Sequence, residues 1–149
     1  DIMKTVGSTV TYCGGIGAGN ITKLANQIIV ALNIAAVGEA LVLAAKAGVD
    51  PETVFKAIRG GLAGSTVLDA KAPMIISRNF KPGFRIRLHQ KDLNNALATA
   101  KELNVPLPFT ALVQQVITAL VNDGKADSDH SAIATFIEGM AGIEVKKLG

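Results

Sequence analysis

A lysine and two amides stand at the start of the longest apolar run in the chain, where chemistry could occur. Lys23, Asn26 and Gln27 are spaced so that, on a helix, the three side chains share one face. Asn20 is expected to cap that helix, which places Lys23 in the first turn, where a cation opposes the helix dipole at a cost of about 0.3–1 kcal/mol. The same position eases release of a proton, as a general acid or base requires. A surface lysine that merely follows a cap is the alternative, and these residues alone leave both interpretations open.

A second charged pair, Lys91-Asp92, falls within a later helix, and Phe84 precedes the lysine by seven residues. Adjacent Lys-Asp pairs are common on solvated helix faces, and a phenylalanine usually belongs to a core. Residue types alone therefore assign structural roles to all three. Gly64-Ser65 could offer backbone N–H groups to an anion, but a helix cap is the simpler interpretation.

The histidines are not predicted to form a site. His89 precedes the Lys-Asp pair by two residues and is expected to point elsewhere on the helix. Asp129-His130-Ser131 has the residue types of a hydrolase triad, but neighbours in sequence do not form that geometry, so a helix start is predicted instead. One cysteine and two distant histidines give no metal site.

Glycine motifs for nucleotide binding are incomplete in this sequence. Gly15 and Gly17 begin a dinucleotide fingerprint, but Asn20 stands where its third glycine is needed, and no βαβ pattern follows. A P-loop needs glycine directly before its lysine, and Thr22 stands there. We therefore expect no nucleotide-binding half within this chain.

The elements that must position these residues are predicted to be helices. Hydrophobic residues make up 49% of the chain and aromatic residues only 4%, which favours aliphatic, alanine-rich helix packing over a sheet. Glycine, proline and capping residues divide the sequence into six helices, after a short extended piece over 9–12. The first helix is apolar on every side and is expected to be buried. The expected helices cover about 20–47, 51–60, 66–77, 88–103, 110–122 and 129–141.

Composition limits the partners and the compartment. A net charge of +3, without a basic run that contains aromatic residues, argues against nucleic acid. Asn33, Glu39 and Lys46 interrupt the apolar run before the ~20 residues that a membrane span needs. The single cysteine and the lack of a signal peptide indicate a cytoplasmic protein. An apolar first helix in so short a chain predicts a homodimer or higher homo-oligomer.

The segment around Lys23 resembles the β-hydroxyacid dehydrogenase family, whose members carry a Gly-x-x-x-Lys-x-x-Asn-[Asn/Gln] motif here. Gly19, Lys23, Asn26 and Gln27 match that motif, and the resemblance extends over nearly the whole chain, through 60–65, 79–84 and 91–93. It implies an all-α domain similar to the 6-phosphogluconate dehydrogenase C-terminal type, built round one long central helix. Residues 1–18 would be a connector from a missing N-terminal Rossmann domain, and residues 19–149 a helical substrate-binding and dimerisation domain.

The resemblance also implies roles for individual residues. The family's lysine is the general acid/base, and the later lysine contacts the cofactor near its nicotinamide. The implied cofactor is NAD or NADP, bound mainly by the missing Rossmann domain. The six residues are catalytic Lys23, substrate-binding Asn26, Gln27 and Phe84, and cofactor-binding Lys91 and Asp92.

The implied reaction is reduction of a small semialdehyde that bears a carboxylate. The residues of these motifs favour tartronate semialdehyde as the substrate, which is reduced to glycerate. Two kinds of alternative stay open. One is the same chemistry on 3-hydroxyisobutyrate, glyoxylate or succinic semialdehyde. The other is a non-catalytic helical dimerisation module, which would have no need of the lysine and the amides.

Overall fold

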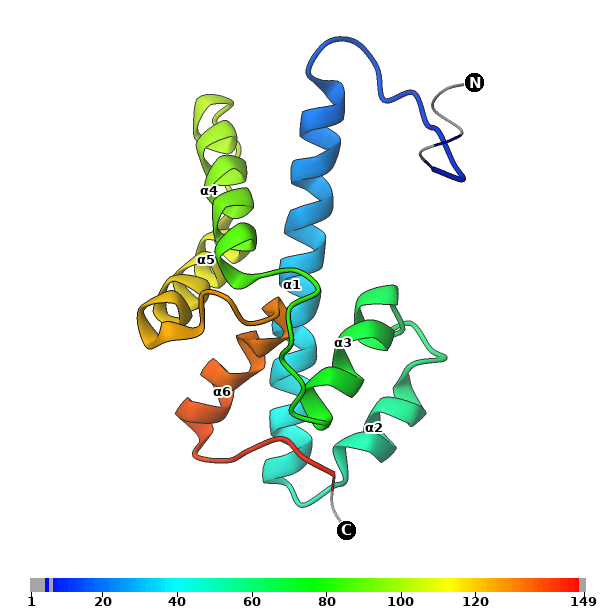
Figure 1. Cartoon of the computed structure of the whole chain (residues 1–149), viewed down its shortest axis with the longest axis vertical. Helices are drawn as coiled ribbons and strands as arrows, with labels where there is room; N and C mark the ends of the chain where they lie inside the picture. The colour runs from blue at the N-terminus through cyan, green and yellow to red at the C-terminus, as the bar shows by residue number, and fades with distance from the viewer. Residues whose placement is uncertain (1–4, 6, 148–149) are drawn as a thin grey trace.

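The computed structural model describes residue 5 and residues 7–147, and this part of the chain contains helices and no strand, as predicted. Figure 1 shows one long helix, α1, with the other helices gathered along it and the N-terminal segment leading away from its far end. Residues 7–17 form no regular structure, although 9–12 were expected to be extended. The helices are α1 (Ala18–Lys46), α2 (Pro51–Ile58), α3 (Thr66–Ile76), α4 (Ile86–Glu102), α5 (Pro108–Leu120) and α6 (Ala134–Ala141), with a π-helical turn η2 (Val121–Lys125) and a 3-10 helix η3 (His130–Ile133) before α6.

The start of α1 differs from the prediction. Its N-cap is Gly17, which adopts a left-handed conformation with φ 89°, and no side chain caps the helix. Asn20 lies inside the helix and is not its cap. Lys23 is therefore the sixth helical residue and lies beyond the first turn, where the effect of the helix dipole has faded. The dipole argument for Lys23 is wrong, and any special property of this lysine must come from its neighbours.

The middle and the C-terminal half of α1 form the centre of the core. Val37, Leu41 and Val42 pack with residues of α2, α3 and α6, while Ala31 and Ile34 pack with residues of α4, α5 and η3. By length and composition α1 could cross a membrane, since its most apolar window has a mean hydropathy of 2.3. Its packing against five other helices supplies a different reason for that composition.

The N-terminal half of α1 is less covered than the sequence suggested. Ile21 and Ile29 are at least half exposed, so the expectation of a helix buried on every side is wrong for this half. Beside it, α4 runs along the same stretch (Figure 1). Residues of α1, α4 and the α4–α5 connection line an apolar groove there. The resulting arrangement leaves an open face where α1 and α4 meet.

The predicted caps of the second and third helices are confirmed. The Asp50 side chain accepts a hydrogen bond from the Thr53 backbone N–H, and Ser65 accepts one from Leu68, so both predicted caps are present. The last predicted helix is divided in two, because Asp129 caps the short η3 and α6 begins only afterwards. An isolated antiparallel bridge between Arg85 and Asp129 ties the start of α4 to this cap.

We predict that the chain forms a homo-oligomer through the open apolar face on α1 and the α4–α5 connection. Ile21, Leu103 and Val105 line one groove and are about half or more exposed, and exposed apolar surface of this kind favours association. Size-exclusion chromatography with light scattering should show a dimer or larger species, and Leu103→Glu should shift it towards monomer. Leu62→Glu is the control, since Leu62 is fully exposed on the α2–α3 connection. A well-folded monomer at micromolar concentration contradicts the prediction.

Candidate active site

Asp92 on α4 draws together polar residues from two helices. Its Oδ1 accepts a hydrogen bond from Nζ of Lys23 at 2.8 Å and lies 3.2 Å from Nζ of Lys91. Its Oδ2 accepts from the side-chain amide of Gln27 at 2.7 Å. Lys23 and Gln27 are one turn apart on α1, so their side chains reach α4 at neighbouring levels. Four of the six residues that the sequence singled out therefore meet at one carboxylate.

The Asp92 carboxylate is buried while its two lysines face solvent. Its side chain is 3% exposed, against 55% for Lys23 and 62% for Lys91. Burial raises the pKa of Asp92, but hydrogen bonds from Lys23, Lys91 and Gln27 outweigh this and hold the pKa below its usual range. Asp92 is thus an anion at neutral pH, and two ammonium groups around one carboxylate leave the centre with an excess positive charge.

An open cleft of about 410 Å³ lies between the N-terminal half of α1 and α4, directly over this centre. The cleft is suited to a small polar ligand, because ammonium, amide and carboxylate groups converge on it. Its lining residues are Asn20, Lys23, Leu24, Lys91, Asp92, Asn95, Ala98, Thr99 and Glu102.

Asn26 acts on the centre through its neighbour. Its Nδ2 donates a hydrogen bond to Oε1 of Gln27 at 3.1 Å. With Oε1 engaged in this way, the Nε2 group of Gln27 is the end that donates to Asp92. Asn26 itself is exposed on α1, where a ligand could reach it.

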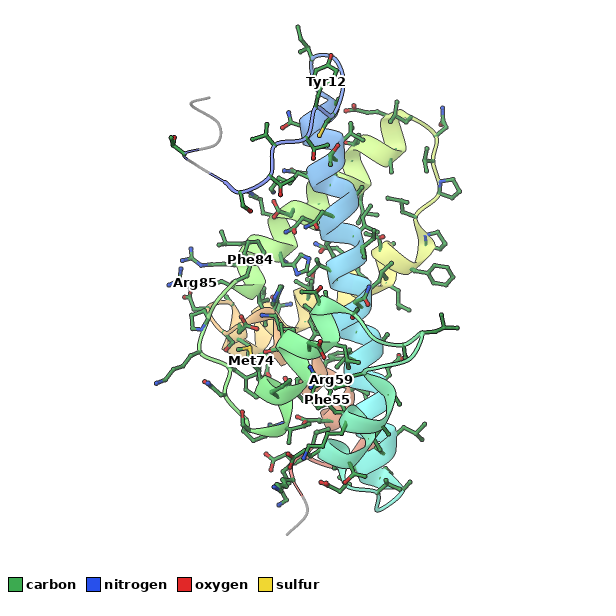
Figure 2. The ribbon with its side chains drawn as sticks, turned by 90° about the vertical axis from the view of Figure 1, so that its right-hand side faces the viewer. Tyr12, Phe55, Arg59, Met74, Phe84 and Arg85 are labelled. Atoms are coloured by element: carbon green, nitrogen blue, oxygen red, sulfur yellow. The ribbon has the colours of Figure 1, made fainter. Side chains whose placement is uncertain are left out.

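Phe84 lies at the start of α4 beside Arg85, as Figure 2 shows, and packs on two histidine rings. Its ring meets His89 edge to face, with centroids 5.7 Å apart, and His130 at 5.3 Å. His89 in turn places Nε2 3.1 Å from the backbone carbonyl of Gln27. Phe84 does not line the cleft over Asp92 but connects to it through His89, so its substrate-binding role stays a prediction.

A buried ion pair holds this aromatic cluster in place. The Asp129 carboxylate is fully buried and accepts from Nζ of Lys71 on α3, at 3.0 Å, and from the backbone N–H groups of Gly83, Phe84 and Ser131. Burial raises the pKa of Asp129, but these donors outweigh it and lower the pKa far below its usual range. The segment before α4 is therefore fixed against η3 and α3.

Two residues of this arrangement, His89 and His130, were not predicted from the sequence. A signal for His89 existed, since it stands three residues before Asp92 and such residues share a helix face. The expectation that His89 points elsewhere is wrong, because both side chains are buried against α1. Asp129 does start a helix as predicted, but no sequence pattern indicated that His130 would meet His89 or that Lys71 would pair with Asp129. Within the described residues no three metal-ligating side chains gather.

We expect the free energy of unfolding to fall as the pH is lowered from about 6.5 to 4.5. Burial is the main cause that lowers the pKa of His89 below 6.5 and that of His130 to about 3, so the unfolded chain binds protons that the folded chain does not. Each histidine that stays neutral contributes a loss of about 1.4 kcal/mol per pH unit in this window.

Urea unfolding at a series of pH values measures this loss. Asp92 and Asp129 do not obscure it, because their pKa values are lowered from 3.8 and their own contribution is lost only at lower pH. His130→Asn should flatten the profile, and a flat profile for the unaltered chain would contradict the prediction.

Known proteins resemble this chain over most of its length. The 2-hydroxy-3-oxopropionate reductase of Escherichia coli strain K12 is 48% identical over 140 residues, which cover 94% of this chain and 48% of that protein. The 2-(hydroxymethyl)glutarate dehydrogenase of Eubacterium barkeri is 36% identical, over 97% of this chain and 48% of that protein. The chain thus spans about half the length of these curated relatives.

A solved structure and a family model agree with these relatives. The 3-hydroxyisobutyrate dehydrogenase of Mycobacterium tuberculosis, solved with L-serine, superposes with a TM-score of 0.84 at 26% identity, over 91% of this chain and 49% of that one. Residues 17–137 match the family described as NAD-binding of NADP-dependent 3-hydroxyisobutyrate dehydrogenase. The match runs from the start of α1 into the first half of α6 and includes the whole Asp92 centre. The chain therefore belongs to this family, the NAD(P)-dependent β-hydroxyacid dehydrogenases.

Proposed function

We propose that the chain is the C-terminal helical half of an NAD(P)-dependent oxidoreductase that reduces a small, carboxylate-bearing semialdehyde. We further propose that the substrate is 2-hydroxy-3-oxopropionate (tartronate semialdehyde), that glycerate is the product and that the enzyme works in the cytoplasm. The 48% identity to the E. coli reductase supports this choice over the substrates of more distant relatives.

The observation that carries the proposal is the pair of ammonium groups on one buried carboxylate. Lys23 and Lys91 both engage Asp92, so this centre has an excess positive charge at one end of the open cleft, while Glu102 lines the cleft ten residues further along α4. An anionic substrate is attracted to such a site, and a neutral or cationic one gains nothing from the charge. A non-catalytic dimerisation module would have no reason to bury a carboxylate beneath two lysines at an open cleft.

In this proposal Lys23 is the general acid of the reduction. A hydride, which bound NAD(P)H would supply, adds to the aldehyde carbon. The carbonyl oxygen then becomes an alkoxide that needs a proton. Asp92 keeps the Lys23 ammonium group at the cleft, where it can give that proton to the oxygen. Water then returns a proton to the amine, and in the oxidative direction the amine accepts the proton from the hydroxyl group.

The residues present suit the reacting end of the cofactor and not its pyrophosphate. Lys91 and the polar groups of the cleft could hold the nicotinamide end beside the substrate. The chain has no glycine fingerprint for a pyrophosphate, so we propose that a Rossmann domain outside this chain binds the rest of NAD or NADP. Asn26 and Gln27 would bind the substrate's hydroxyl or carboxylate group.

We predict that Lys23→Met in the intact enzyme lowers kcat by about 10²–10⁴-fold, the usual contribution of a positioned acid or base. Cofactor affinity should change little, since the residue is not assigned to the cofactor. Folding should survive, because the Lys23 side chain is 55% exposed and Asp92 keeps Lys91 and Gln27 as partners. Steady-state kinetics, cofactor titration and thermal melting on one preparation measure the three effects.

Lys56→Met is the matched control for Lys23→Met. Lys56 pairs with Glu52 on the exposed face of α2, far in sequence from the cleft, so its loss should leave the rate unchanged. Near-full rate in Lys23→Met would remove this lysine from the mechanism and favour the dimerisation module.

We predict that the 149-residue chain alone neither turns over substrate nor binds NAD(P)H tightly. It holds the proposed acid/base lysine but lacks the pyrophosphate motif that anchors a dinucleotide. Isothermal calorimetry with NADH and NADPH measures the affinity, and cooperative thermal melting of the same sample shows that it is folded. A dissociation constant in the micromolar range or below would mean that the cofactor site lies within this chain.

A further inference from the structure

Two buried histidines meet nitrogen to nitrogen beside the Asp92 centre. Nδ1 of His89 lies 3.0 Å from Nδ1 of His130, and both side chains are at most 5% exposed. A hydrogen bond between two ring nitrogens needs one donor and one acceptor, so the two Nδ1 atoms must differ in protonation. The contact between His89 and the backbone carbonyl of Gln27 decides which Nδ1 is the donor.

The backbone carbonyl of Gln27 fixes the tautomers of the pair. It lies 3.1 Å from Nε2 of His89, and since a carbonyl can only accept, Nε2 carries the proton. In a neutral ring Nδ1 of His89 is then the acceptor, and Nδ1 of His130 must be the donor. Each ring thus has one defined neutral form, with His89 protonated on Nε2 and His130 on Nδ1.

His89 and Asp92 together fasten α4 to a single residue of α1. Asp92 accepts from the Gln27 side chain at 2.7 Å, and His89 donates to the Gln27 backbone one turn earlier on α4. One contact would leave α4 free to turn or slide about it, whereas two contacts define both its rotation and its level along α1. The position of Asp92 relative to Lys23 follows from this attachment.

We propose that His89 is a positioning residue for the Lys23–Asp92 centre, and that His130 holds the His89 ring in the neutral form and orientation that meet the Gln27 carbonyl. The role in catalysis rests on the function proposed above, while the role in geometry does not. The backbone N–H of His130 also donates to the Phe84 carbonyl at 2.9 Å. The same residue therefore helps to hold Phe84, whose ring packs on the two histidines.

The charges around the pair favour its neutral form. Lys71 on α3 and Lys23 on α1 oppose a proton on the rings, while Asp92 on α4 and Asp129 before η3 attract one. Each carboxylate already has a lysine partner, Lys23 for Asp92 and Lys71 for Asp129. Burial is the largest cause that lowers the pKa of both rings, so the pair stays neutral in the range where an enzyme works.

Nitrogen NMR on the unaltered, histidine-labelled chain tests the tautomers without any need for activity. We expect one ring protonated on Nε2 and the other on Nδ1 at neutral pH, with the pKa of His89 below 6.5 and that of His130 about 3. Assignment through His130→Asn should leave the Nε2-protonated ring, which is His89. A ring pair that titrates at or above pH 6.5, or His89 protonated on Nδ1, overturns the proposal.

Paired variants test positioning, each pair differing in one donor. His89→Leu removes the donor to Gln27, and His89→Gln restores an amide N–H near the position of Nε2. His130→Leu and His130→Asn do the same for the Nδ1 donor. In the intact enzyme we expect the leucine variants to lose about 10–100-fold in kcat with the KM for cofactor nearly unchanged, as for a small displacement of reacting groups. The amide variants should recover most of that rate.

Gln114→Leu is the control for the loss of a partly buried hydrogen bond to α4. Gln114 on α5 donates to Asn94 on α4 at 2.6 Å, away from Gln27, so its loss should reduce stability without changing kcat. In the chain alone, the side-chain amide resonances of Gln27 should shift in His89→Leu and stay in place in Gln114→Leu. Equal resonance shifts in both variants, or an unchanged kcat in His89→Leu, overturn the positioning role.

The outcomes separate this proposal from the proposed function. If the unaltered enzyme reduces no semialdehyde while the tautomers and the Gln27 shifts are as expected, the proposed function fails and the geometric role stands. If the unaltered enzyme is active while the tautomers are reversed, the proposed function stands and the role of His89 fails.

Discussion

The structure of the site depends on one buried anion. A carboxylate that is 3% exposed is stable only when donors replace the water it has lost, and Asp92 finds them in Lys23, Lys91 and Gln27. Two of these donors belong to α1, so α4 must run alongside α1 at this level and in this rotation. The need to satisfy this oxygen pair, together with the His89 contact and the apolar cluster that α1 and α4 share, sets how the two helices cross, and the crossing creates the cleft.

The length of α1 allows one helix to serve the core and the site. Its middle and C-terminal half contact every other helix and carry the fully buried Ala31, Ile34 and Leu41. Its N-terminal half extends past that core beside α4 (Figure 1). There Lys23 and Gln27 donate hydrogen bonds to Asp92 of α4. Because the helix is continuous, the packing that orients one half also orients the other, and side chains on a rigid element are placed more accurately than those on a loop.

Much of the fold could be predicted because its signals are local. Asp50 and Ser65 cap helices within three residues of themselves, and composition favoured packed helices over a sheet. The site was found in part through a motif, but its central contact joins Lys23 to Asp92 across 69 positions, and no spacing rule reaches that far. The start of α1 was misjudged because Gly17 takes a left-handed conformation that replaces the expected Asn20 cap. The histidine pair was missed because each ring, taken alone, is an ordinary core histidine.

The polar groups of this centre are buried, and hydrogen-bond partners satisfy them. Asp92, Gln27, His89 and His130 are each at most 9% exposed, and each has a partner that satisfies it. A buried network of this kind is sensitive to the loss of any member, since the group left behind remains desolvated. The same network leaves the ammonium groups of Lys23 and Lys91 at the solvent side, where they are free to meet a ligand. The domain thus presents its charged groups at the solvent side of a buried network, and part of that network, His89 and His130, does not line the cleft.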